Sequence, residues 1–172
     1  MDRRPESSEY LKELSKYVDL VPAEGDIITI FREQTDEICT FISNLTEEQG
    51  DYRYAPEKWS IKEMVGHLAD TGRIMSYRLL CIARGDTTPL PGFEEKDYVL
   101  TANFEAHTLK ALLAHYKVVR ESTLLLMETL PEEAWIRKGI VNEATLSARA
   151  QACIMIGHDH HHLNILKERY LG

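Results

Sequence analysis

The amino-acid sequence predicts an all-α protein, a four-helix bundle, and two observations support this prediction. Apolar residues recur at helical spacing in four long segments, and almost no stretch alternates as a β-strand would. Residues that start or stop helices stand between these segments. With 172 residues the chain can bury one substantial core, so we expect a single domain over residues 1–172.

The first long helix follows a short segment over residues 10–18. We expect it to open at Pro22, which suits the start of a helix, and to end near residues 46–50. Its apolar residues are spaced for one buried stripe. A polar loop over residues 51–58 leads to the next element.

The second helix has clear signals at both ends. Ser60 and Glu63, three residues apart, form the pattern of a capping box, which predicts that the helix starts here. It is expected to run to about Arg84, because Gly85 then supplies a stop.

The third helix is predicted over residues 103–130, where Pro131 forces its end. After a connector, a fourth helix is capped by Thr145 or Ser147 and runs to about Tyr170. The sequence does not distinguish between these two caps.

The long connection between the second and third helices bears on topology. It has about 17 residues and could span about 50 Å, more than the length of either helix. A crossover along the bundle is therefore possible, and the shorter connections on either side favour antiparallel neighbours. The predicted order is up, down, down, up.

Charge and composition exclude several kinds of partner. A net charge of −8 gives no electrostatic basis for binding nucleic acid or an anionic membrane. The N-terminal residues lack a signal-peptide pattern and no apolar run is long enough to span a bilayer, so we expect a cytoplasmic protein. Sequence motifs for dinucleotides, nucleoside triphosphates, serine hydrolases, thioredoxins and ferritin-type di-iron sites are absent.

The histidines suggest a metal site. His158 and His162 are four residues apart, so both imidazoles lie on one helix face within reach of a single ion. His67 lies about 10 Å from the start of the second helix and His162 about 12 Å from the end of the fourth. If these helices are antiparallel, the three side chains are level, and they are the predicted ligands.

Each of these histidines can also be interpreted without a metal ion. A lone buried histidine such as His67 is more often a hydrogen-bonded core residue than a ligand, and only the combination of three favours a metal. His161 is three residues from His158 and competes with His162 for the third position, although we favour His162.

Several motifs resemble the DinB/YfiT-like family, and the resemblance spans most of the chain. They are Tyr54-Ala55-Pro56-Glu57-Lys58-Trp59-Ser60-Ile61-Lys62-Glu63, Gly66-His67-Leu68-Ala69-Asp70, and Gly157-His158-Asp159 followed by His161-His162. The resemblance implies a four-helix bundle of up-down-down-up order in which His67, His158 and His162 hold the metal. It also implies a possible homodimer and a small-molecule substrate. Some family members are S-transferases that use bacillithiol or mycothiol, and others have been proposed to be hydrolases.

A three-histidine site leaves a coordination position open, which is typical of catalytic rather than structural metal sites. Imidazole ligands suit a divalent transition metal, with zinc or nickel the first choices. Glu63 and Asp70, one turn to either side of His67, could orient its imidazole, although Glu63 also fits the capping box. Asp159 could act as a general base, by analogy with the acid of the zincin motif.

Three functions remain open at this point. The first is a metal-dependent transferase that uses a low-molecular-weight thiol, and the second is a metal-dependent hydrolase. The third is a non-catalytic bundle that binds metal or a partner. The sequence does not identify the residues that would bind a thiol cofactor.

Overall fold

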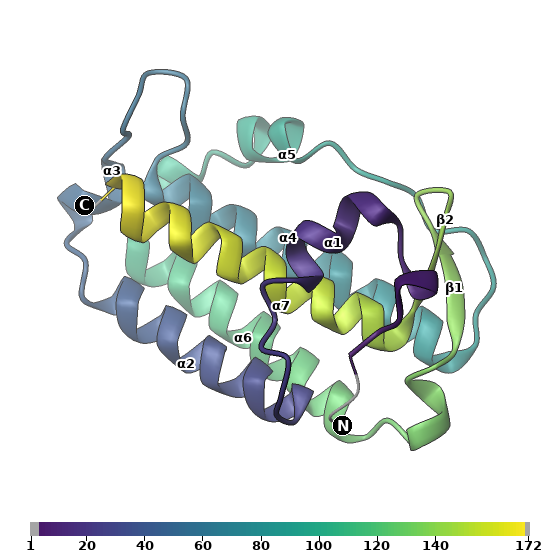
Figure 1. Cartoon of the computed structure of the whole chain (residues 1–172). Helices are drawn as coiled ribbons and strands as arrows, with labels where there is room; N and C mark the ends of the chain where they lie inside the picture. Colours follow the sequence, from purple (N-terminus) through teal and green to yellow (C-terminus); the bar gives the residue numbers. More distant parts are fainter. Residues whose placement is uncertain (1–3, 171–172) are drawn as a thin grey trace.

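The computed structural model describes residues 4–170 and is mostly helical. Four helices form the bundle: α2 (Ile27–Ser43), α4 (Ile61–Arg84), α6 (Leu109–Glu128) and α7 (Ala148–Ile165). They lie side by side along most of their lengths (Figure 1), with α4 packed against both α6 and α7. The predicted helical bundle is therefore present.

Shorter elements surround the bundle. The N-terminal segment contains two 3₁₀ turns, Ser7–Glu9 and Lys12–Leu14, followed by α1 (Ser15–Val18), which packs on α7. The turn of α3 (Glu47–Asp51) connects α2 to the loop before α4. In Figure 1 the purple N-terminal segment crosses the outer face of the yellow α7.

Side-chain caps explain where the long helices begin. The Asp26 carboxylate accepts hydrogen bonds from the backbone N–H groups of Ile28 and Thr29, so α2 begins at Ile27 and not at Pro22 as predicted. Gly25 just before it has a positive φ of 99°, which interrupts the helical backbone. The predicted capping box of Ser60 and Glu63 starts α4, and Gly85, in the left-handed region, ends it.

The connection between α4 and α6 contains more regular structure than the sequence suggested. It includes α5 (Glu95–Ala102) and a 3₁₀ turn, Phe104–Ala106. Asn103 between them has a left-handed backbone with φ of 52°, so the predicted third helix cannot start there. Instead α6 begins at Leu109 after the Thr108 cap.

The connector before α7 forms a β-hairpin that the sequence analysis missed. Strands β1 (Lys138–Val141) and β2 (Ala144–Ser147) pair antiparallel after a 3₁₀ turn, Glu132–Ala134. Ser147, the second of the two predicted caps, accepts a hydrogen bond from the Ala150 N–H and starts α7. The α-helix ends at Ile165 and continues as a π-helical turn, Leu166–Tyr170.

Buried apolar residues form two clusters along the bundle. One includes Phe31, Leu79 and Met155, and the other includes Ile38, Leu68 and Tyr116. No helix within residues 4–170 is long and apolar enough to cross a membrane.

Candidate metal centre

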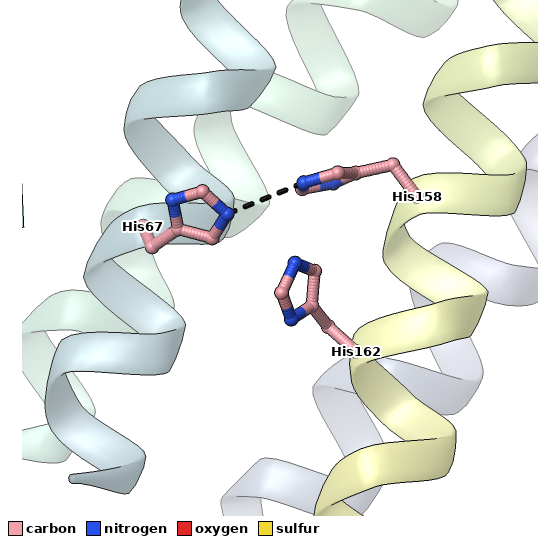
Figure 2. A group of neighbouring side chains, drawn as sticks. All are labelled: His67, His158 and His162. Carbon is pink, nitrogen blue, oxygen red and sulfur yellow. Dashed lines mark hydrogen bonds between the residues drawn. The ribbon is translucent and has the colours of Figure 1, made fainter. Parts of the chain in front are cut away.

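Three histidine side chains meet between α4 and α7. His67 comes from α4, and His158 and His162 come from successive turns of α7 (Figure 2). One ring nitrogen from each lies within 4.8 Å of the others, and all three residues are buried. His67 is near the start of α4 and the other two are in the second half of α7.

The shortest approach joins His67 Nε2 and His158 Nε2, which lie 3.2 Å apart. Two nitrogens that ligate one tetrahedral zinc at bond lengths of about 2.0 Å would be separated by about 3.3 Å. The spacing of these two imidazoles therefore fits a shared metal ion.

The imidazoles of His67 and His158 also contact other side chains through their Nδ1 atoms. His158 Nδ1 lies 3.2 Å from an Asp159 carboxylate oxygen, and His67 Nδ1 lies 3.3 Å from Thr71 Oγ1. A carboxylate only accepts hydrogen bonds, so His158 Nδ1 carries the proton and its Nε2 offers a lone pair toward the cluster. This is the tautomer that a metal ligand needs.

The electrostatic environment lowers the pKa of two of the three imidazoles, those of His67 and His162. Burial, reinforced by the neighbouring His158, lowers the pKa of His67 to about 3. Burial and the nearby histidines also lower the pKa of His162 well below its ordinary value. Metals bind the unprotonated form of imidazole, so this donor set is suited to a divalent transition metal.

Asp159 belongs to a buried network behind His158. Its carboxylate accepts hydrogen bonds from the Tyr116 hydroxyl at 2.8 Å and from the Arg120 guanidinium at 3.1 Å. Arg120 also donates to the Phe31 carbonyl and to the side chains of Gln34 and Thr35. Although burial raises the pKa of Asp159, Arg120 and His158 outweigh that effect and lower it overall.

This network surrounds Asp159, for which the sequence suggested the role of a general base. Its two oxygens are occupied by Tyr116, Arg120 and His158, and the residue is only 5% exposed. The carboxylate therefore orients His158, and its role as a general base stays a prediction. Neither Tyr116 nor Arg120 belongs to a motif that the sequence analysis recognised.

Glu63 and Asp70 pair with arginine side chains rather than with the imidazoles. Glu63 completes the capping box and forms an ion pair with Arg53 at 2.6 Å. Asp70 pairs with Arg73 at 3.0 Å. The position predicted for them beside His67 is taken by Thr71, which lies one helical turn after it.

His161 has a different environment from His162. It is half-buried and its ring packs edge-on against Tyr17 of α1. His162 lies within the three-nitrogen group, so the geometry favours it as the third ligand.

Two further side chains approach the cluster, and the sequence analysis did not select either. The Trp59 ring packs 4.8 Å from the His67 ring and covers it. A Glu95 carboxylate oxygen lies 3.9 Å from His67 Nε2, and this side chain is 53% exposed. Glu95 comes from the connection between α4 and α6, which no local spacing relates to the histidines.

A cavity of about 470 Å³ lies next to the cluster. His158 and Thr71 line one part of it, and the walls continue along α4, α7, the β-hairpin and the N-terminal segment. A small organic molecule would fit a space of this size beside the imidazoles.

Comparisons with known proteins agree with this fold. The model of the DinB superfamily matches residues 30–166. YfiT from Bacillus subtilis, described as a probable metal-dependent hydrolase with an unusual four-helix bundle topology, superposes with a TM-score of 0.72 at 17% identity. That match covers 97% of this chain and 91% of YfiT.

A mycothiol-dependent maleylpyruvate isomerase superposes with a TM-score of 0.66 at 15% identity, and the match covers 80% of this chain. It covers only 58% of the isomerase. A mutant of a mycothiol-dependent maleylpyruvate isomerase gives the same TM-score at 14% identity. No curated protein matches the sequence. At these identities the similarity demonstrates a shared fold.

Proposed function

Because the chain belongs to the DinB superfamily, we propose that it is a metal-dependent enzyme that attaches a low-molecular-weight thiol to an electrophile. His67, His158 and His162 would hold one divalent transition metal, with zinc or nickel the first candidates. The observation that supports this most is the group of three buried imidazoles beside a cavity.

When bound, such a metal lowers the pKa of a thiol or a water molecule at its open position. The chain itself contributes three things. Asp159 fixes the tautomer of His158, Trp59 covers His67, and the cavity holds the organic part of the substrates.

Thiol transfer is favoured over hydrolysis because of the environment of Asp159. Hydrolysis usually requires a general base near the attacking water, and the hydrogen bonds from Tyr116 and Arg120 occupy Asp159. A thiol whose pKa is lowered loses its proton to solvent and needs no such base.

A metal-dependent hydrolase is the second candidate, and Glu95 is the observation that favours it. Its carboxylate oxygen is 3.9 Å from His67 Nε2, close enough to serve as a base near the site. The likeness to YfiT points in the same direction.

Elemental analysis of untagged protein, followed by turnover assays, tests the proposal. We expect one equivalent of metal per chain and a rate above background with at least one thiol and a chromogenic electrophile. Substoichiometric metal, or no rate with any thiol, would contradict it. If an ester or amide is hydrolysed instead and Glu95→Gln abolishes that activity, the second candidate is correct.

Two structural expectations accompany this proposal. Arg32, near the start of α2, pairs with Glu128 at the end of α6, which supports antiparallel packing of these two helices. Tyr170, beyond the end of α7, donates to the Trp59 carbonyl just before α4, which supports the same packing of α4 with α7, as the up-down-down-up order requires. A homodimer is also expected, and light scattering would test it.

A further inference from the structure

The cavity beside the histidines contains a buried positive charge away from the metal centre. Arg78 of α4 lines the cavity and is only 9% exposed. One guanidinium nitrogen donates to the Pro91 carbonyl at 2.7 Å, and the group lies 5.6 Å from the Phe93 ring centroid. No carboxylate within residues 4–170 pairs with it.

This environment is unusual for an arginine in this chain. Two other arginines with little exposure, Arg120 and Arg149, each contact a carboxylate, that of Asp159 and Glu9 respectively. Burial lowers the pKa of Arg78, and no acidic neighbour offsets this effect. Buried charges in proteins are normally paired, so the guanidinium is suited to an anionic group from a ligand.

Gln151 of α7 is a second, independent indication. It lines the same cavity and is only 1% exposed. Its amide carries N–H donors that can bind an anionic group in this cavity. It lies seven residues before His158 on the same face of α7, about 10 Å along the helix axis.

The other surfaces of the cavity narrow the class of ligand. Met75, Leu146 and Ile154 supply an apolar wall. Three carboxylates, those of Glu13, Glu94 and Glu95, also border the cavity, but all three residues are exposed. Water screens these charges, yet they disfavour a ligand that carries several negative charges.

We propose that this cavity binds a small monocarboxylate, with its carboxylate on Arg78 and Gln151 and its apolar body along α7 toward the histidines. A planar guanidinium matches a carboxylate in two-pronged geometry. The inference rests on the proposed function, because it assigns a chemical class to a substrate of that same site.

Matched acid and amide probes test this inference by calorimetry on the metal-loaded full-length protein. The pairs are 4-phenylbutyrate with 4-phenylbutyramide, and hexanoate with hexanamide. We expect each acid to bind at least about tenfold more tightly than its amide, as for a charge-assisted hydrogen bond. The dianion glutarate should bind more weakly than hexanoate.

Arg78→Gln should abolish the preference for the acid. The control Arg73→Gln removes an exposed arginine of the same helix that does not line this cavity, and it should retain the preference. Should Arg78→Gln fail to fold, Arg78→Lys replaces it, and a smaller preference for the acid is then expected.

Equal binding of acid and amide, including no binding of either, would overturn the inference. So would a preference that survives Arg78→Gln. If that surviving preference disappears in His162→Ala, the acid binds at the metal, and the metal site is supported while this inference fails. A preference that depends on Arg78 in a protein without metal would instead support the inference and contradict the proposed enzyme.

Discussion

Asp159→Asn separates a positioning role for this residue from a catalytic one. The substitution keeps the shape of the side chain and replaces one acceptor oxygen with an NH₂ donor. If the amide oxygen faces Tyr116 and Arg120, the NH₂ group faces His158 Nδ1, which is 3.2 Å from the carboxylate oxygen in the wild-type protein. His158 then shifts its proton to Nε2 and loses the lone pair that a metal requires.

The structure allows the size of the effect to be estimated. Loss of a carboxylate that orients a metal-binding histidine typically weakens metal affinity about 10- to 100-fold, which corresponds to about 1.4 to 2.7 kcal/mol. Breaking a buried ion pair costs about 3 to 5 kcal/mol of stability. Because Arg120 retains Phe31, Gln34 and Thr35 as partners, we expect about 3 kcal/mol.

Metal titration and urea unfolding measure these two effects, and an activity assay at saturating metal decides between the roles. A positioning residue predicts that added metal restores most of the turnover. If Asp159→Asn binds metal as tightly as the wild-type protein but has no turnover, Asp159 is the base and our account of the network is wrong.

Three further predictions concern separate parts of the chain. His162→Ala should reduce bound metal well below one equivalent in elemental analysis, whereas His161→Ala should retain it; equal loss would contradict the ligand assignment. Gly157→Ala should destabilise the protein by about 3 kcal/mol or more in urea unfolding, because a Cβ at this position would overlap the Tyr17 carbonyl oxygen. Gly72→Ala is the control with a smaller expected effect, since a Cβ there meets only a Val119 methyl group at 3.0 Å. Burial raises the pKa of Glu9, but hydrogen bonds from Arg149 and Ser147 outweigh this effect and lower the pKa from 4.5 to about 2. Glu9 therefore contributes about 3 kcal/mol to the free energy of unfolding above pH 4.5, and this contribution is lost as the pH falls toward 2. Glu9→Gln should remove this part of the acid sensitivity, and an unchanged pH profile would contradict it.

Features of the fold that depend on local chemistry were predictable from the sequence. The start of α4 was correct because Ser60 and Glu63 cap each other within one turn. The start of α2 was wrong because Pro22 suits a helix opening, whereas the backbone at Gly25 and the Asp26 cap delay it. Rules based on sequence spacing identify helices better than their exact ends.

The β-hairpin was missed for a different reason. Its strands have only four residues each, and the turn uses Asn142 and Glu143, both at positive φ, rather than a recognisable Asn-Gly pair. A parallel bridge from Val141 to Leu90, in the connection between α4 and α6, adds support from a distant part of the chain. No pattern within ten residues of sequence contains that information.

In the candidate metal centre, too, local sequence spacing predicts some features, whereas others depend on distant segments of the chain. Helical spacing predicts that His158 and His162 lie on one helix face. Antiparallel packing of the second and fourth predicted helices predicts that His67 lies at the same height along the bundle. The network behind the site was not predictable, because Tyr116 and Arg120 reach Asp159 across 43 and 39 residues of sequence. Their side chains meet only once α6 packs in the bundle.

The three predicted ligands differ in how firmly the fold orients them. His158 has a carboxylate behind it that is itself fixed by Tyr116 and Arg120, and His67 has only the hydroxyl of Thr71. His162 Nδ1 is buried without a hydrogen-bond partner among residues 4–170. Since outer hydrogen bonds fix the tautomer and raise the basicity of a metal-binding imidazole, His158 should hold the metal most strongly and His162 least. Ligand strength in this site thus depends on the side chains of α6 as much as on the histidines themselves.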